Sequence, residues 1–242
     1  MTSKSSTRIL LKLSGEILMG NQPFGIHQEA CQQVADSIKE LASHNVQIGI
    51  VIGGGNIFRG IQLQQDGVAR TPADQMGMVA TILNGMALQQ ALSSIGCDAV
   101  IMSALDCPKV AESYTWKSCI EHLSRNQIVI FTGGTGNPYF TTDTAAALRA
   151  SEINASVLLK ATKVNGVYDK DPQKFKDAIK YPTIDYSRVL AEKLGVMDAT
   201  AIAMCRSNHV PVFVFNMQYL LKKQIKEILT FDNAFGTLIQ GE

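Results

Sequence analysis

Short apolar runs alternate along the chain with longer segments in which apolar residues recur at helical spacing. The runs that predict buried strands are 8–13, 46–52, 98–103, 127–132, 156–160, 211–215 and about 237–239. Helical spacing predicts helices over 27–44, from Pro72 to about Gly96, around 116–123, near 143–153, within 186–208 and between the last two strands. Strands that alternate with helices are typical of an α/β protein with a mainly parallel sheet covered by helices on both faces. Ligands of such sheets bind at the carboxyl ends of the strands.

The composition fits this pattern and excludes several classes of protein. Hydrophobic residues make up 46% of the 242 residues and charged residues 18%, enough apolar surface for a substantial core. A formal net charge of +1 excludes binding of nucleic acid by overall charge. No apolar run approaches the roughly 18–20 residues of a membrane span, and the N-terminal apolar stretch is too short for a secretory signal. We therefore expect a cytoplasmic protein with neither nucleic acid nor membrane as a partner.

Four clusters of glycine and polar residues each follow a predicted strand. The first, KLSGE at 12–16, places Lys12 late in a strand and Gly15 after it, so that an ammonium group and backbone N–H groups can approach a phosphate. The second, GGGNIFRG at 53–60, exposes backbone N–H groups to an anion, and the guanidinium group of Arg59 could add two charged hydrogen bonds. The alternatives are a strand lysine beside a turn glycine in the first cluster and a flexible loop in the second.

The other two clusters carry more hydroxyl groups and charges. TGGTGNPYFTTDTAA at 132–146 favours a polar ligand, although Thr142 or Asp143 also suits the N-cap of the helix that follows. In KATKVNGVYDKDP at 160–172, lysines, a tyrosine and aspartates surround Asn165–Gly166, a pair that predicts a tight turn or hairpin. Solvated turn charges are the alternative interpretation of this last cluster.

Sequence signatures of several other enzyme classes are missing. The chain contains no GxxxxGK[ST] and no GxSxG, and Tyr139 stands where a GxGxxG motif would need its third glycine. The five cysteines are scattered without a CxxC pair, which indicates reduced thiols and argues against a structural metal site. The four histidines lie away from the polar clusters, so the sequence gives little support to catalysis by a histidine base.

Four strand ends suited to anions in one chain predict two phosphate-bearing ligands that meet across a crevice. Phosphoryl transfer needs such an arrangement, because it depends on positioning and charge neutralisation more than on covalent chemistry by the protein. An acceptor phosphate is largely ionised at neutral pH, since its second pKa is about 6. The lack of an obvious catalytic base is therefore no obstacle to this reaction.

Six motifs, in order, resemble those of the bacterial uridylate (UMP) kinases of the amino-acid-kinase fold family. They are KLSGE at 12–16, VIGGGNIFRG at 51–60, DQMGM at 74–78, GTGNPYFTTD at 134–143, LKATKVNGVYDKDP at 159–172 and VFNM at 214–217. The resemblance implies a three-layer α/β sandwich in a single domain, with an acceptor lobe of about 1–150 and an ATP lobe of about 151–242. It also implies transfer of the γ-phosphoryl group of ATP to UMP with Mg²⁺, in pyrimidine nucleotide biosynthesis, by a homohexamer.

The resemblance further implies roles for individual residues. The expected catalytic residues are Lys12, which neutralises transition-state charge, Asp143, which orients the lysines, and Lys160, with Lys163 as the alternative second cation. The expected ATP-binding residues are Lys12, Leu13, Ser14, Gly15, Gly55, Arg59, Thr162, Tyr168 and Asp171. The expected UMP-binding residues are Gly54, Asp74, Thr135, Gly136, Asn137, Pro138, Tyr139, Phe140, Thr141 and Thr142, with Asp74 on the ribose hydroxyls.

One departure from the family concerns regulation. Many members are activated by GTP through basic residues on the helix that here reads GMALQQALSS at 85–94, and this stretch has no Arg, Lys or His. We expect no GTP activation through that contact, but we expect UTP to inhibit, because it presents the same uracil and ribose as UMP. Two alternatives stay open: a kinase of the same fold with a carboxylate or carbamate acceptor, and a non-catalytic nucleotide-binding protein. Asp74 argues against the first, and Lys12, Arg59 and Asp143 argue against the second.

Overall fold

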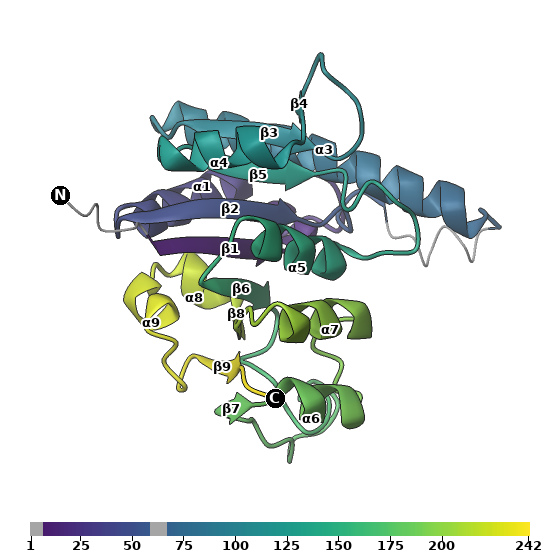
Figure 1. Cartoon of the computed structure of the whole chain (residues 1–242), viewed down its shortest axis with the longest axis vertical. Helices are drawn as coiled ribbons and strands as arrows, with labels where there is room; N and C mark the ends of the chain where they lie inside the picture. Colours follow the sequence, from purple (N-terminus) through teal and green to yellow (C-terminus); the bar gives the residue numbers. More distant parts are fainter. Residues whose placement is uncertain (1–6, 59–66) are drawn as a thin grey trace.

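The computed structural model describes residues 7–58 and 67–242, and these form one nine-stranded sheet flanked by helices (Figure 1). The strand order is β4-β3-β5-β2-β1-β6-β8-β9-β7, and β8–β9 is antiparallel whereas the other neighbours are parallel. The strands are β1 Thr7–Leu13, β2 Val46–Ile52, β3 Ala99–Ser103, β4 Glu112–Ser113, β5 Ile128–Thr132, β6 Val157–Thr162, β7 Thr183–Ile184, β8 Val212–Asn216 and β9 Gly236–Ile239. The predicted α/β class with a mainly parallel sheet is confirmed.

Helices cover both faces of the sheet. They are η1 Gly15–Leu18, α1 Gln28–Ala42, α3 Arg70–Ser94, α4 Trp116–Ser124, α5 Thr142–Glu152, α6 Tyr186–Ala191, α7 Ala199–Ser207, α8 Met217–Leu221 and α9 Ile225–Leu229. The core on one face is built with α1, α3, α8 and α9, and the core on the other face with α4, α5, α6 and α7. Within the part of the chain that the structure describes, no helix is both long and apolar enough to cross a membrane.

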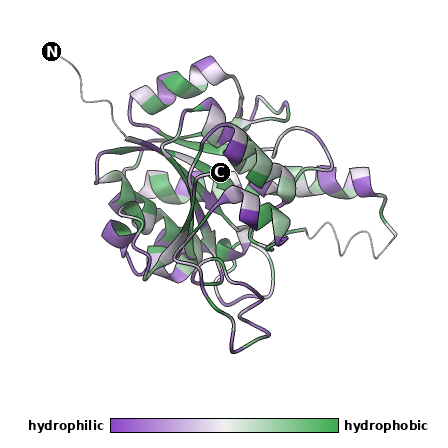
Figure 2. Cartoon of the chain, turned by 60° about the horizontal axis from the view of Figure 1, so that its bottom comes forward, coloured by the Kyte–Doolittle hydropathy of each residue, from purple (hydrophilic) through white to green (hydrophobic). Residues whose placement is uncertain are grey.

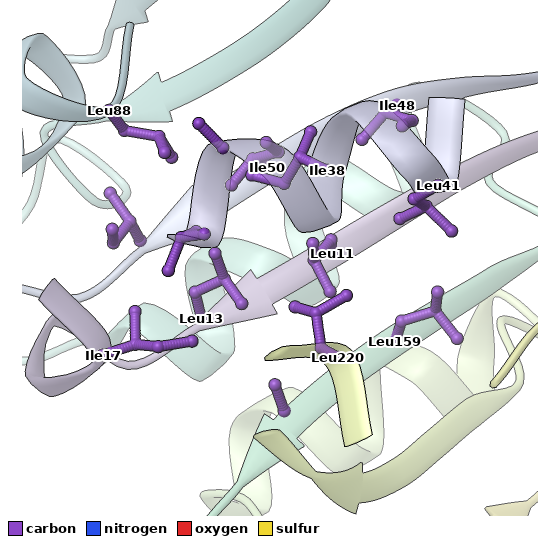
Figure 3. Packing of buried hydrophobic residues seen from close by; sticks show 14 of the residues in the cluster. Leu11, Leu13, Ile17, Ile38, Leu41, Ile48, Ile50, Leu88, Leu159 and Leu220 are labelled. Atoms are coloured by element: carbon purple, nitrogen blue, oxygen red, sulfur yellow. The ribbon is translucent and has the colours of Figure 1, made fainter. Parts of the chain in front are cut away.

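The central strands are apolar on both sides because each side packs against a helix layer. Along β1, Leu11 and Leu13 belong to one core and Leu10 to the other, and all three are fully buried. Figure 3 shows Leu11 and Leu13 beside side chains of α1 and β2, with Leu220 of α8 and Leu159 of β6 below them. Figure 2 shows hydrophobic and hydrophilic residues alternating along the helices that flank the sheet.

The structure departs from the sequence prediction in several places. The pair Asn165–Gly166 lies in a bend and closes no tight hairpin, because the segment after it runs out to pair Tyr168 with Lys180. The two-residue strands β4 and β7 were not predicted, since two residues carry no alternating pattern. α3 begins at Arg70, so Pro72 is its third residue and not its first.

Candidate active site

The four polar clusters meet because the strands before them are neighbours in the sheet. β5, β2, β1 and β6 lie side by side and run parallel, so their carboxyl ends share one edge (Figure 1). The N–H of Gly53, directly after β2, donates to the carbonyl of Leu13 at 2.9 Å. A Cβ on Gly53 would lie 3.3 Å from the nitrogen of Gly15 and 3.6 Å from Oγ1 of Thr142. Three clusters are therefore in contact, and β6 brings the fourth beside them.

A carboxylate between two ammonium groups lies at the centre of this edge. Lys12 of β1 and Lys160 of β6 are register partners, so their side chains leave the sheet on the same face. Oδ1 of Asp143 lies 2.7 Å from Nζ of Lys12, and Oδ2 lies 2.6 Å from Nζ of Lys160. All three side chains are at most 15% exposed. The structure brings together the three residues expected to be catalytic.

The start of α5 fixes Asp143 in this position. The N-cap is Thr141, whose Oγ1 accepts from the N–H of Asp143 at 3.0 Å, so the prediction of Thr142 or Asp143 as the cap was wrong. Because Thr141 caps the helix, the side chain of Asp143 is free to face the lysines. A carboxylate in the first turn is also favoured by the helix dipole.

The charges in this cluster depend on one another. Burial raises the pKa of Asp143, but the positive charges of Lys12 and Lys160 outweigh burial and hold its pKa below the ordinary value. Burial also lowers the pKa of Lys160, against the opposing effect of Asp143. Within the group formed by Lys12, Asp143 and Lys160, two ammonium groups face one carboxylate, an arrangement that suits a phosphate beside the lysines.

Lys163, the alternative second cation, lies elsewhere. Its side chain is 61% exposed and pairs with Glu16. Lys160 instead donates to the carbonyl of Val196 in addition to its bond with Asp143. The structure thus places Lys160, and not Lys163, against Asp143.

A cavity of about 660 Å³ opens beside this cluster on the β6 side. Lys12 and Ser14 line its inner end, and Thr162, Tyr168 and Asp171 line it along β6 and the segment that follows. The other lining residues are Lys160, Ala161, Lys163, Val164, Gly166, Val167, Asp169, Lys170, Pro172, Gln173, Glu192, Lys193, Leu194, Gly195, Val196, Val214 and Met217. Five of the expected ATP-binding residues therefore share one cavity.

A smaller pocket of about 140 Å³ lies on the other side, between the loop after β2, the first turns of α3 and the start of α5. Five expected UMP-binding residues line it: Gly54, Asp74, Phe140, Thr141 and Thr142. Gly55, expected on the ATP side, lines this pocket instead. The remaining residues that line the smaller pocket are Phe58, Ala73, Gly77, Met78, Thr81 and Gly134.

The loop from Thr135 to Tyr139 is tied to α3 by Asp74. Oδ2 of Asp74 accepts from the backbone N–H of Tyr139 at 2.8 Å and from Nε of Arg70 at 2.8 Å. Tyr139 adopts a left-handed φ of 73°, which turns the chain at that bond, and its ring lies under the Arg70 guanidinium. The oxygen Oδ2 is already engaged within the protein, so Oδ1 of Asp74 is the oxygen with more accepting capacity for a ligand.

The remaining expected residues lie near these pockets or outside the described part of the chain. Leu13 is buried at the end of β1, and Ser14 caps η1, of which Gly15 is the first residue. Thr135 and Asn137 bond to each other within the loop after β5, which also contains Gly136 and Pro138. Arg59 lies outside the described residues.

Sequence reasoning missed a buried amide pair that holds this edge together. Asn56 and Asn84 donate to each other at 2.9 and 2.7 Å, and Asn84 also donates to the carbonyl of Gly53 at 2.7 Å. One turn earlier on α3, Oγ1 of Thr81 accepts from the N–H of Gly133 at 2.8 Å. α3 therefore positions the loops after both β2 and β5. A polar amide within a mainly apolar stretch of helix is the signal that would have indicated Asn84.

Asp198 was also missed. It caps α7 by accepting from the N–H of Ala201 at 2.8 Å, and it accepts from the hydroxyls of Thr141 and Thr144. This carboxylate joins the start of α5 to the start of α7. In the sequence, Asp198 matches an ordinary helix cap, which conceals its second set of partners.

Among residues 7–58 and 67–242, no three His, Cys, Asp or Glu side chains come together in a way that could hold a metal ion. Mg²⁺ commonly binds through one or two carboxylates together with substrate phosphates. The site therefore fits a metal that arrives with a nucleotide.

Comparisons of the sequence with known families agree with this geometry. The family described as "Amino acid kinase family" matches residues 7–216. The chain is 62% identical over 232 residues to a protein named uridylate kinase from Protochlamydia amoebophila, covering 96% of this chain and 92% of that one. It is 54% identical over 212 residues to one of the same name from Acinetobacter baumannii, covering 87% and 88%.

Solved structures with a similar fold are also UMP kinases. The fold is similar to a structure titled UMP kinase from Bacillus anthracis, with a TM-score of 0.91, 33% identity and coverage of 97% and 96% of the two chains. A UMP kinase from Ureaplasma parvum gives a TM-score of 0.91, 36% identity and coverage of 98% and 99%. The chain therefore belongs to the amino acid kinase family and, within it, to the uridylate kinases.

Proposed function

We propose that this enzyme transfers the γ-phosphoryl group of ATP to UMP and releases ADP and UDP. The observation that carries the proposal is the Asp143 carboxylate, which pairs with two lysines that line the larger cavity and directly follows Thr142, which lines the smaller pocket. The relatives named uridylate kinase and UMP kinase supply the identity of the acceptor. The two pockets supply places for two ligands whose phosphates meet at the lysines.

ATP is assigned to the cavity of about 660 Å³, in the proposed lobe 151–242. Its phosphates would reach Lys12 and Ser14, with Mg²⁺ arriving as part of the nucleotide substrate. Thr162, Tyr168 and Asp171 would contact the rest of the nucleotide. The volume supports this assignment, because small-molecule sites commonly measure about 300–1,000 Å³.

UMP is assigned to the pocket of about 140 Å³ and the loop 135–142 beside it, in the proposed lobe 1–150. The carboxylate of Asp74 accepts hydrogen bonds from the ribose hydroxyls of UMP. The side-chain hydroxyls and backbone N–H groups of residues 135–142 surround the phosphate and uracil. A carboxylate at this point suits a diol, whereas an amino-acid acceptor would need cations. The enclosed volume is small for a nucleotide, so we expect the loop to move outward when UMP binds.

The chemistry asks little of the protein beyond charge and position. The acceptor phosphate is largely ionised at neutral pH, so no general base is required. Lys12 and Lys160 neutralise the charge that develops on the transferred phosphoryl group, and Asp143 holds both ammonium groups in place. The pKa of Asp143 is lowered and its carboxylate pairs with both lysines, which suits a positioning group better than a proton acceptor.

The proposal also covers how the enzyme is regulated, how it assembles and where it acts in the cell. UTP would inhibit in the acceptor pocket, because it carries the uracil and ribose of UMP. GTP would not activate through residues 85–94, where Gln89 donates to the carbonyl of Ala99 at 2.8 Å. We further propose a homohexamer that acts in pyrimidine nucleotide biosynthesis in the cytoplasm; the five free cysteine thiols fit a reducing compartment.

An acceptor panel tests the proposed function. ADP release from Mg-ATP would be measured with UMP, CMP, dTMP, AMP, acetylglutamate and aspartate. We expect turnover with UMP and far weaker turnover with the others. Turnover with an amino acid would keep the fold but overturn the acceptor, and nucleotide binding without any turnover would favour a regulatory protein.

A further inference from the structure

A buried hydroxyl group of the sheet contacts both ends of one wall of the larger cavity. Thr237 of β9 is fully buried. Its Oγ1 accepts from the N–H of Val167 at 2.9 Å and donates to the carbonyl of Tyr181. Val167 and Tyr181 begin and end the segment whose residues 167–173 line the cavity. The hydroxyl therefore holds both ends of this cavity wall at once.

At Gly166 the backbone of the wall lies so close to Thr237 that a residue with a side chain would not fit there. A Cβ on Gly166 would lie 2.4 Å from Oγ1 of Thr237, and Gly166 adopts a φ of 140°. Val167 and Tyr181 also bond to each other, N–H of Tyr181 to carbonyl of Val167, at 2.9 Å. The base of the wall is thus a compact unit of two short backbone segments around one hydroxyl.

The same residue belongs to the sheet that carries the catalytic lysine. Thr237 pairs with Val214 of β8, and Val214 pairs with Lys160 of β6. Paired strand residues therefore connect Thr237, through Val214, to Lys160, which pairs with Asp143. Tyr168 and Asp171, on the far side of the cavity, are placed relative to Lys160 through these pairs.

We infer that Thr237 is a positioning residue that sets the distance between the Tyr168–Asp171 wall and the Lys160 strand, and with it the affinity for ATP. The inference rests on the proposed assignment of this cavity to ATP. Thr237 acts through Val167 and Tyr181, because it does not itself line the cavity. Removal of the hydroxyl leaves a buried N–H and a buried carbonyl without this partner, which frees the wall to shift.

The test uses Thr237→Val, which keeps the volume and removes the hydroxyl, and Thr237→Ser, which keeps the hydroxyl. Ser37→Ala is the matched control, since Ser37 is fully buried in α1 and its hydroxyl bonds within that helix. For Thr237→Val we expect KM for ATP to rise about tenfold, with KM for UMP and kcat within about twofold of the parent. Thr237→Ser and Ser37→Ala should leave KM for ATP unchanged.

Calorimetric titration of Mg-ATP without acceptor keeps this test separate from the proposed reaction. A lower ATP affinity in Thr237→Val, restored in Thr237→Ser, supports the inference even if UMP proves not to be the acceptor. Unchanged ATP affinity in Thr237→Val overturns it. An equal rise of KM for ATP and UMP overturns it too, since that is the result of a general loss of structure. Should Thr237→Val fail to fold, a tenfold loss of ATP affinity in Thr237→Ser would still contradict the inference.

Discussion

At the scale of single residues, Asp143 joins elements that are far apart in the sequence. Its two oxygens take one lysine each, from β1 and from β6, and its backbone N–H is held by Thr141. The sequence predicted all three catalytic candidates through resemblance, but it left Lys160 and Lys163 as alternatives. Strand register separates them, because Lys160 faces Lys12 across the β1–β6 pair whereas Lys163 follows the end of β6.

Replacement of Asp143 by Asn removes the counter-charge of two ammonium groups in a mostly buried site. We expect Asp143→Asn to lose about 3 kcal/mol of unfolding free energy at neutral pH and about 100-fold in kcat. The folded-state pKa of Asp143 is lowered, so its stabilisation is full above the ordinary carboxyl range and is lost as pH falls through the lowered value. The difference in unfolding free energy between parent and variant should therefore shrink in acid.

Urea titrations at a series of pH values measure that difference. Asp177→Asn is the control, because Asp177 is 78% exposed in its pair with Lys170 and should change stability little. A difference between parent and Asp143→Asn that stays constant down to strongly acid pH would contradict the assigned charge state.

At the scale of elements, α3 shows what sequence patterns reveal and what they miss. Its apolar spacing predicted a helix of nearly the observed length. The spacing did not reveal that Asp74 and Thr81 bind the loop after β5 and that Asn84 binds the loop after β2, since polar partners at long sequence separation leave no periodic signal. The main strands were predicted within a residue or two because they are buried on both faces and read as continuous apolar runs.

We expect Asn84→Leu to raise KM for UMP about tenfold and to cost about 1–3 kcal/mol of stability, because Asn56 and the carbonyl of Gly53 lose a buried partner. Gln89→Leu is the matched control on the same helix, where the amide donates to Ala99 away from the smaller pocket. Steady-state kinetics and thermal unfolding measure both effects. Equal KM values for UMP in the two variants would contradict the positioning role of Asn84.

At the scale of the whole molecule, the strand order explains why separate sequence clusters form one site. The clusters follow β1, β2, β5 and β6, which are neighbours in the sheet in the order β5-β2-β1-β6, although β3 and β4 separate the two pairs in the chain. The sequence indicated a parallel sheet without giving this order, because pairing between strands depends on how the helices cross over. The sites could therefore be expected at strand ends, but their contacts could not be derived.

The exposed face of α3 is a candidate contact surface between copies of the chain in the proposed homohexamer. Val79, Leu83 and Met86 are spaced along one side of the helix and are 50%, 45% and 39% exposed. If this face contacts another copy of the chain, Leu83→Glu should lower the mass measured by light scattering, while Val110→Glu, at another exposed apolar position, should not. A monomeric parent protein, or an unchanged mass for Leu83→Glu, would contradict the proposed contact.

The central claim is that two specific lysines on one carboxylate form the transfer site. Its most direct test is kcat at saturating Mg-ATP and UMP for Lys12→Ala, Lys160→Ala and Lys163→Ala. We predict losses of about 100-fold or more for the first two, which meet at Asp143, and a change within about threefold for the exposed Lys163. Near-normal turnover of Lys12→Ala or Lys160→Ala, or a loss confined to Lys163→Ala, would contradict the account.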